Sequence, residues 1–338
     1  MTRAAPRVSV LLPVRDAAST LDACLASLLG QSLQDFEVLA VDDGSRDASG
    51  ERLAAAAQRD ARIVRLCSPR PGLVPALNAA LAAARAPLLA RMDADDVASP
   101  RRLESQAERF AAEPGLDILG CRVELIEDPV SPAPGMRAYV AWQNALLDHE
   151  AIVRDVYVES PLVHPSVMLR AGRLRELGGY REFPGPEDYD LWLRALRRGC
   201  RFAKLEETLL RWRDRPSRLT RTDPRYAPAR FFELKLEALE QDRLPPGRPV
   251  VVWGAGPRPC RWARALRERG HPTAAFVEVD ERKLGQRIHG ASVLAPRDAG
   301  LHGPLHLAAV GQKGARERIR AAAAGLGLAE GRDFVAVA

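Results

Sequence analysis

The feature that most constrains the fold is an alternation of apolar runs and amphipathic segments along residues 1–125. Residues 8–13 (VSVLLP) and 36–41 (FEVLAV) are apolar without interruption, which is typical of strands covered on both faces. Between them, leucines recur at helical spacing from residue 21 to 29, and Gly30 is suited to end that helix. Such alternation predicts an α/β fold built on a mostly parallel sheet.

The same reading predicts further elements along the chain. They are a helix through residue 57, strands at 62–66, 88–92 and 167–170, and helices at 74–84, 188–199 and 228–243. From 126 to 160 the pattern is weaker, and Pro129, Pro132, Pro134 and Gly135 predict a loop.

The chain of 338 residues is long enough for more than one domain at about 100–200 residues each. Its clearest linker is 245–247 (PPG), and residues 249–338 repeat the strand–helix rhythm on a smaller scale. We therefore expect a first domain at 1–222, a helical connector and linker at 223–247, and a small Rossmann-like α/β domain at 248–338.

Composition limits the cellular compartments and the kinds of partner that we expect for this protein. No apolar stretch approaches the ~18 residues that span a bilayer, and five cysteines without a CxxC pair indicate neither zinc nor disulfides. We expect a cytoplasmic protein. The net charge of +6 comes from basic and acidic residues that are interleaved, which argues against a nucleic-acid partner. Peripheral attachment at the inner face of the membrane, and oligomer formation, stay open.

The segment RMDADDVASP places Asp93, Asp95 and Asp96 directly after the apolar strand at 88–92. Like charges this close repel one another unless a cation or hydrogen-bond donors compensate them. A solvated acidic turn is one explanation. A metal site is the other, because side chains two apart on extended chain face the same way and oxygen ligands suit Mg2+ or Mn2+.

Two other strand ends carry polar residues as well. The first strand runs into Pro13, Arg15 and Asp16, and the second into Asp42 and Asp43. Ligands of open α/β sheets bind beyond the carboxyl ends of the strands. Carboxylates there suit the N–H and hydroxyl donors of a base and a ribose, although DDGS is also an ordinary strand end followed by a helix cap.

Four motifs, taken in order, resemble the nucleotide-sugar-binding half of the family-two inverting glycosyltransferases, which have the GT-A fold. They are VSVLLPVRD, FEVLAVDDGSRD, GLVPALNAAL and LLARMDADD. The later stretch HPSVMLR…LGGYREFPGPEDYDLWLRAL is similar to the acceptor half of that family, especially in bacterial enzymes that build surface polysaccharides. The resemblance covers residues 7–220.

The resemblance implies a role for each matching residue. Asp42 and Asp43 would contact the nucleoside, with Pro13, Arg15 and Asn78 in the same donor site. Asp95 would be the direct metal ligand, Asp93 a ribose or metal contact, and Asp96 would shape the site. Of the pair Glu187 and Asp188, Asp188 would be the general base. Arg211 begins RWRDRPSRLTR, which matches a region that can fold over the diphosphate.

The implied reaction is a single displacement on a UDP-sugar or another nucleotide-sugar, assisted by Mn2+ or Mg2+, with a glycan or lipid-linked acceptor. Some assignments have simpler alternatives. Glu187 and Asp188 could complement a helix dipole, the arginine-rich stretch could be a solvated loop, and His164 could be structural. The chain departs from the family pattern at Asp16 and Leu77, where asparagine and arginine are common.

The second domain opens with WGAGPRP, in which Gly254 and Gly256 match two glycines of a dinucleotide-binding fingerprint and Pro259 replaces the third. Glu278 and Asp280 end the next strand, where a ribose-binding acid is expected. The alternative function is thus a non-catalytic nucleotide-sugar or dinucleotide sensor. A nucleotidyltransferase is disfavoured, since no glycine-rich basic loop follows the first strand.

Overall fold

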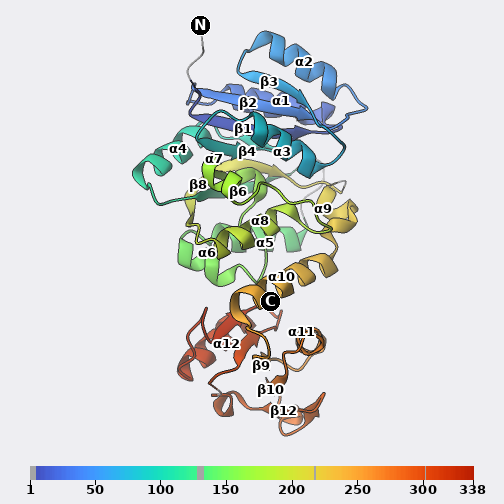
Figure 1. Cartoon of the computed structure of the whole chain (residues 1–338), viewed down its shortest axis with the longest axis vertical. Helices are drawn as coiled ribbons and strands as arrows, with labels where there is room; N and C mark the ends of the chain where they lie inside the picture. Colours follow the sequence, from blue (N-terminus) through green and yellow to red (C-terminus); the bar gives the residue numbers. More distant parts are fainter. Residues whose placement is uncertain (1–4, 128–132, 217, 301) are drawn as a thin grey trace. The chain divides into compact units, whose positions relative to one another are not determined.

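The computed structural model describes residues 5–127, 133–216, 218–300 and 302–338. These residues form two compact units (Figure 1). The first comprises the described chain up to Ile152 together with Pro161–Ala227, and the second comprises Val153–Ser160 together with Pro228–Ala338. Each unit contains its own sheet and helices.

The sheet of the first unit has eight strands in the order β3-β2-β1-β4-β7-β6-β8-β5. The strands are β1 (Val8–Val14), β2 (Phe36–Asp42), β3 (Ile63–Cys67), β4 (Leu88–Arg91), β5 (Val97–Ala98), β6 (Ile118–Ile126), β7 (Met168–Arg170) and β8 (Phe202–Arg213). Strands β1 to β4 are parallel, β7 is antiparallel to β4 and β6, and β5 is antiparallel to β8. The expected mostly parallel first half is confirmed.

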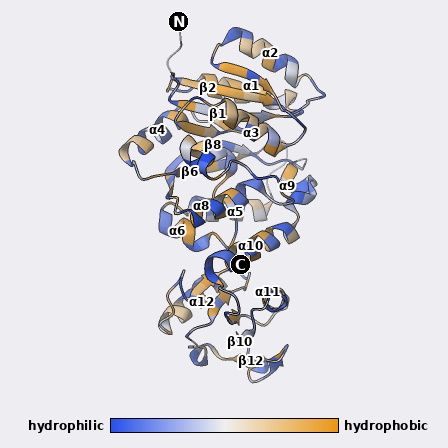
Figure 2. Cartoon of the chain, viewed as in Figure 1, coloured by the Kyte–Doolittle hydropathy of each residue, from blue (hydrophilic) through white to orange (hydrophobic). Residues whose placement is uncertain are grey.

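Helices follow most of these strands. They are α1 (Ala18–Leu29), α2 (Ser49–Arg59), α3 (Leu73–Ala83), α4 (Arg102–Ala112), α5 (Pro134–Asn144), α6 (His149–Asp155), α7 (Ala171–Glu176), α8 (Glu187–Arg197) and α9 (Leu219–Thr222), with the short 3-10 helices η1 (His164–Ser166) and η2 (Pro224–Tyr226). Every residue of β1 is buried, as the unbroken apolar run predicts, and Figure 2 shows the central strands β1 and β2 in hydrophobic colours.

The loop predicted at Pro134 and Gly135 is wrong, because these residues begin α5, and α6 also lies within the region 126–160 where the sequence pattern is weak. Pro134 is the first residue of α5, a position at which the missing N–H of proline costs no helical hydrogen bond. The predicted loop positions Pro129 and Pro132 lie outside the described residues. The sequence reading also missed β6 and β8, whose polar residues interrupt the apolar pattern.

The order of strands fixes the position of the functional edge. β1 lies between β2 and β4, so the chain proceeds to opposite sides of β1, and such a reversal is where open α/β sheets bind ligands. The β1–β4 pairing ends at Leu11 and Arg91, whereas the β1–β2 pairing continues to Val14 and Asp42. The polar residues after all three strands therefore lie at the same edge.

The second unit has a six-stranded sheet in the order β11-β12-β10-β9-β13-β14, parallel except for β11. Its elements are α10 (Pro228–Arg243), β9 (Val250–Trp253), α11 (Pro257–Glu268), β10 (Thr273–Val277), η3 (Glu281–Lys283), β11 (Arg287–Ile288), β12 (Ala291–Leu294), η4 (Pro296–Asp298), β13 (Leu305–Ala308), α12 (Ala315–Gly325) and β14 (Phe334–Ala336). The predicted small α/β architecture is present.

The division between the units differs from the boundaries expected at residues 222 and 247. Helix α10 groups with the second unit, and so does the segment Val153–Ser160 from the middle of the chain. Two contacts hold that segment: the hydroxyl of Tyr157 donates to Asp242 at 2.7 Å, and Asp155 pairs with Arg320. Among the helices described, none combines the length and the apolar character that crossing a membrane requires.

Candidate functional site

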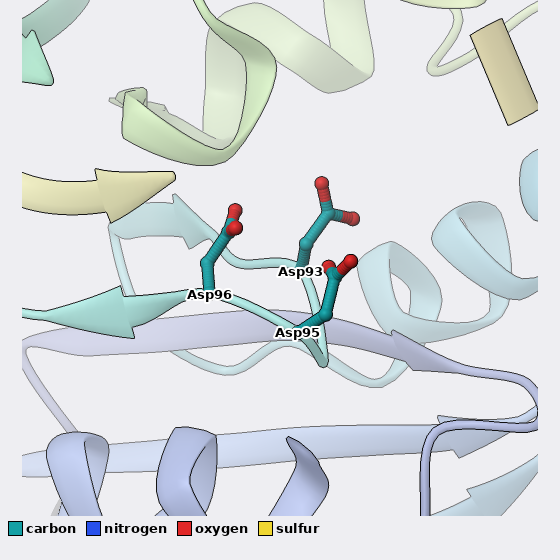
Figure 3. Close-up of side chains that lie close together, drawn as sticks. All are labelled: Asp93, Asp95 and Asp96. Atoms are coloured by element: carbon teal, nitrogen blue, oxygen red, sulfur yellow. The ribbon is translucent and has the colours of Figure 1, made fainter. Parts of the chain in front are cut away.

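An acidic turn follows β4 at the functional edge of the first sheet. Asp93, Asp95 and Asp96 each bring a carboxylate oxygen within 4.8 Å of the others. Figure 3 shows the three side chains rising from the turn between β4 and β5 toward the same side. Asp93 and Asp95 are about 30% exposed, whereas Asp96 is buried. The cluster is therefore not a fully solvated turn.

Burial and mutual repulsion act on this cluster. Desolvation is the largest cause that raises the pKa values of Asp95 and Asp96, and the charge of Asp93 raises them further. Oxygen Oδ1 of Asp96 accepts from the backbone N–H of Arg213 at 2.8 Å, but its buried Oδ2 has no hydrogen-bond partner. Converging oxygen atoms that include an unsatisfied buried one fit a hard divalent cation such as Mg2+ or Mn2+.

Two buried arginines stabilise the acidic turn, one through a carboxylate and the other through backbone and sulfur contacts. Arg91, the last residue of β4, contacts the carboxylate of Asp93. Arg102 on α4 donates to the carbonyl oxygen of Arg91 at 2.7 Å and to the sulfur of Met92 at 3.2 Å. The sequence reading missed both arginines, although two basic residues flanking the acidic run were the available signal.

The predicted nucleoside residues lie at the ends of β1 and β2. Asp43 is buried; it accepts from the backbone N–H of Gly72 at 2.7 Å and pairs with Arg15 at 3.3 Å. Asp42 accepts from the N–H of Ser45 at 3.0 Å and so closes the turn after β2. Pro13 is buried within β1, one residue before its end. The structure brings Arg15 and Asp43 together, while Asp42 also has a local structural role.

Asn78 on α3 connects two distant parts of the unit. Its amide nitrogen donates to the carbonyl of Tyr180 at 2.8 Å, and its amide oxygen accepts from the N–H of Tyr180 at 3.0 Å. A Cβ on Gly179 would meet that oxygen at 2.7 Å, so only glycine fits there. A cavity of about 480 Å³ lies beside this contact, lined by Pro69, Arg70, Pro75, Asn78, Ala79, Tyr180 and Glu182.

The predicted carboxylate pair begins helix α8, and its two members differ. Glu187 is buried, accepts from the hydroxyl of Tyr226 at 2.5 Å, and lies 3.6 Å from the ring nitrogen Nδ1 of His164. Burial opposes ionisation of Glu187, but these partners outweigh it and lower its pKa. The other ring nitrogen of His164 bonds the hydroxyl of Tyr180 at 3.0 Å, so this histidine is a satisfied core residue.

Asp188 points elsewhere and keeps part of its surface accessible. Desolvation first, and then the adjacent charge of Glu187, raise its pKa to about 7. A carboxylate with that pKa is suited to accept a proton near neutral pH. The charge of Arg91 opposes this rise and lowers the pKa of Asp188 by a smaller amount.

The arginines of the segment 211–221 contact different parts of the first unit. Arg211 lies within β8 and pairs with Glu124 at 3.2 Å, with both side chains more than half exposed. Arg213 and Arg215 are the arginines that reach the acidic turn: Arg213 donates to the carbonyl of Asp95, and Arg215 pairs with its carboxylate. The sequence reading chose Arg211 because periodicity did not reveal that β8 continues to Arg213.

The loop after β9 offers few free backbone N–H donors to a dinucleotide. Glu278 accepts from the backbone N–H of Ala255 at 3.0 Å, which occupies a donor of the loop after β9. Pro257 and Pro259 remove two further N–H groups from the start of α11. The alternative function as a dinucleotide sensor is therefore not favoured.

A sheet with an acidic turn beyond β4 and a carboxylate pair at the start of α8 defines a GT-A-like glycosyltransferase fold. The chain belongs to Glycosyl transferase family 2, whose family model matches residues 9–177. The family resemblance read from the sequence motifs is confirmed for residues 9–177.

Curated relatives match about three fifths of the chain. An uncharacterized glycosyltransferase of Haemophilus influenzae is 28% identical over 213 residues, 62% of this chain and 65% of the relative. Putative glycosyltransferase EpsE of Bacillus subtilis is 28% identical over 223 residues, 62% of this chain and 73% of the relative. The amylovoran biosynthesis glycosyltransferase AmsE of Erwinia amylovora is 29% identical, covering 61% of this chain and 75% of the relative.

The solved structure of S. aureus TarS 1-349 in complex with UDP-GlcNAc superposes with a TM-score of 0.56. It is 18% identical, and the match covers 69% of this chain and 66% of that one. At that identity the match shows the fold alone.

Proposed function

We propose that this protein is a metal-dependent inverting glycosyltransferase of the hexosyltransferase type, which uses a UDP-sugar as its donor. The observation that carries the proposal is the acidic turn, in which Asp93, Asp95 and Asp96 bring carboxylate oxygens within 4.8 Å of one another at the carboxyl edge of the sheet. The second group is Asp188, whose pKa burial and the charge of Glu187 raise to about 7. A donor's diphosphate and an acceptor's hydroxyl need these two kinds of group close together.

Each set would perform one part of the reaction. Asp188 would take the proton of the acceptor hydroxyl as its oxygen attacks the anomeric carbon and the bond to the diphosphate breaks. Glu187, held by Tyr226, keeps a negative charge beside Asp188 that supports its basicity. One displacement inverts the anomeric carbon. Asp95 and Asp93 would hold Mn2+ or Mg2+, which neutralises the leaving diphosphate.

Residues at the ends of β1 and β2 would hold the nucleoside. Asp43 lies against Arg15 and the backbone of Gly72, and it would accept a hydrogen bond from the base. The UDP-GlcNAc in the TarS complex supports the choice of a uridine donor. AmsE of E. amylovora and the O-antigen biosynthesis glycosyltransferase WbnJ of E. coli support polysaccharide assembly on a glycan or lipid-linked acceptor.

The test is a thermal-shift measurement with a panel of nucleotides, with and without Mn2+. We expect UDP to raise the melting temperature only when Mn2+ is present, because the cation joins the diphosphate to the acidic turn. Asp95→Ala should remove this shift. The matched control is Asp22→Ala, an exposed aspartate on α1, which should leave the shift unchanged.

Two outcomes would contradict the proposal. Equal stabilisation by UDP in the absence of metal would remove the proposed role of the acidic turn. Stabilisation by NAD(H) alone would move the ligand site to the second unit and favour the sensor.

A further inference from the structure

The acidic turn already has a cation that belongs to the chain. Guanidinium nitrogen Nη2 of Arg215 lies 3.2 Å from Oδ2 of Asp95 and donates to the hydroxyl of Thr20 on α1 at 3.1 Å. The neighbouring Arg213 binds the same turn through its backbone N–H, which donates to Asp96, and through Nε, which donates to the carbonyl of Asp95 at 3.0 Å. The chain after β8 is thereby attached to the cluster.

The positively charged side chain of Arg215 contacts Asp95, the residue that would be a metal ligand in the proposed function. Its guanidinium lies against the Asp95 carboxylate, with both side chains only about one quarter exposed. A divalent ion bound by Asp95 would have to share that carboxylate with the guanidinium. Two cations within contact distance of one carboxylate repel each other, so Arg215 and the metal compete.

The two arginines of the site differ in their freedom to move. Arg91 is 3% exposed and is fixed within β4. Arg215 is 27% exposed and follows the end of β8. Its nitrogen Nε is buried without a hydrogen-bond partner, so its position against Asp95 leaves one donor unsatisfied. Arg215 can therefore gain a hydrogen bond by leaving. Arg91 also has a buried Nε without a hydrogen-bond partner, but its buried side chain has little access to solvent.

We propose that Arg215 is an exchangeable counter-ion: it neutralises Asp95 in the absence of metal, and binding of a divalent cation releases it onto the diphosphate of the donor. A diphosphate offers paired oxygens that match the planar guanidinium. The inference rests on the proposed function, and it goes further by naming the residue that senses the cation and joins metal binding to donor binding.

The experiment measures Mn2+ binding alone, by titration with electron paramagnetic resonance detection of the free ion. Arg215→Gln removes the competing charge, so we expect it to bind Mn2+ at least about threefold more tightly than the wild type. With Mn2+ saturating, the same variant should bind UDP about tenfold more weakly, because the diphosphate loses an arginine. Arg215→Lys, which keeps the charge, should retain wild-type Mn2+ affinity.

Arg221→Gln is the matched control. Arg221 lies in the same segment and loses the same charge, but it pairs with Asp214 at 2.7 Å and not with the acidic turn. It should leave Mn2+ affinity unchanged, and circular dichroism checks that every variant is folded.

The outcomes separate this inference from the proposed function. Unchanged or weaker Mn2+ binding in Arg215→Gln overturns the counter-ion role while leaving the metal site intact. If Arg215→Gln binds Mn2+ more tightly but binds UDP with unchanged affinity, the proposed contact of Arg215 with the diphosphate is wrong. Absence of Mn2+ binding in the wild type, or binding that survives Asp95→Asn, overturns the proposed function itself.

Discussion

At the scale of single residues, the site depends on charges that are buried but paired. Arg91, Glu187 and Asp188 are each removed from water to a large extent, and each is stabilised or shifted by a named neighbour. The asymmetry of the carboxylate pair follows from this: Tyr226 and His164 stabilise the charge of Glu187, which leaves Asp188 as the carboxylate that resists ionisation. Perturbed values of this kind concentrate at functional sites.

The pKa of about 7 for Asp188 predicts the pH dependence of transfer. The base acts when deprotonated, so kcat/KM should fall as the pH drops through about 7 and level off above it. Asp188→Asn should lower kcat by about 10²–10⁴-fold and remove the acidic limb. Initial rates measured between pH 5 and 9 test this expectation.

Glu176→Gln is the control for that experiment, since Glu176 is exposed and pairs with Arg173. This variant should keep the wild-type kcat and the same fall in kcat/KM at low pH. An acidic limb that persists unchanged in Asp188→Asn would assign the base to another group.

At the scale of elements, contacts between segments far apart in sequence position the site. Asn78 of α3 fixes the backbone of Tyr180 in the turn before α8, 102 residues later. The hydroxyl of Tyr180 bonds His164, which in turn lies beside Glu187. Helix α8 is thus placed relative to the parallel strands by a chain of polar contacts in addition to apolar packing.

Two adjacent glycines in that turn allow a matched stability test. Gly178 and Gly179 both have positive φ, 79° and 70°, but only a Cβ at 179 would meet another atom, Oδ1 of Asn78. Gly178→Ala should cost about 1–2 kcal/mol of unfolding free energy from backbone strain alone. Gly179→Ala should cost about 1–3 kcal/mol more, because it also displaces Asn78. Urea unfolding measures both, and equal costs would show that the Asn78 contact is dispensable.

At the scale of the whole molecule, charge is distributed unevenly along the chain. Residues 1–227 contain 32 basic and 32 acidic residues, whereas 228–338 contain 18 basic and 12 acidic ones, so the net charge of +6 comes from the C-terminal part. Helix α11 presents exposed arginines at 258, 261, 264 and 267. Such an excess predicts attraction to an anionic surface, at about 1 kcal/mol per residue near it. This bears on the peripheral attachment that the sequence left open.

Vesicle sedimentation tests this location. We expect the protein to bind vesicles containing phosphatidylglycerol at low salt, and to lose that binding as salt screens the charges. The double variant Arg264→Gln/Arg267→Gln should weaken it, while Arg59→Gln/Arg109→Gln in the first unit should not. Equal binding to uncharged phosphatidylcholine vesicles would contradict an electrostatic attachment.

The segment Val153–Ser160 predicts how the second unit is stabilised. Asp155 is 3% exposed and contacts Arg320 and Arg316 of α12. Asp155→Asn should lower the free energy of unfolding by about 3–5 kcal/mol, because it removes the buried negative charge that pairs with both Arg316 and Arg320. Glu330→Gln removes a more exposed partner of the same Arg320 and should cost no more than about 1 kcal/mol. Chemical denaturation compares the two, and similar costs would contradict a special role for Asp155.

The sequence by itself determined the fold class and the main carboxylates. Unbroken apolar runs predicted β1, β2 and β4, because buried parallel strands tolerate few polar residues. The polar residues after β2 and β4 include Asp43 and Asp95, which lie at one edge because the ends of parallel strands do so regardless of the details of packing. Asp188, at the start of α8, was predicted only through the resemblance to the family. These inferences depend on local patterns, which are readable along the chain.

Only the tertiary structure decided which charges meet. Arg91 and Arg102 flank the acidic run in the sequence, but only the structure shows that Arg91 contacts Asp93 and that Arg102 donates to the carbonyl of Arg91. The choice of Arg215 over Arg211 depends on the length and register of β8. The assignment of residues 153–160 to the second unit depends on Asp155 and Tyr157. Electrostatic contacts act through space over a few ångströms, whereas sequence patterns report only neighbours along the chain.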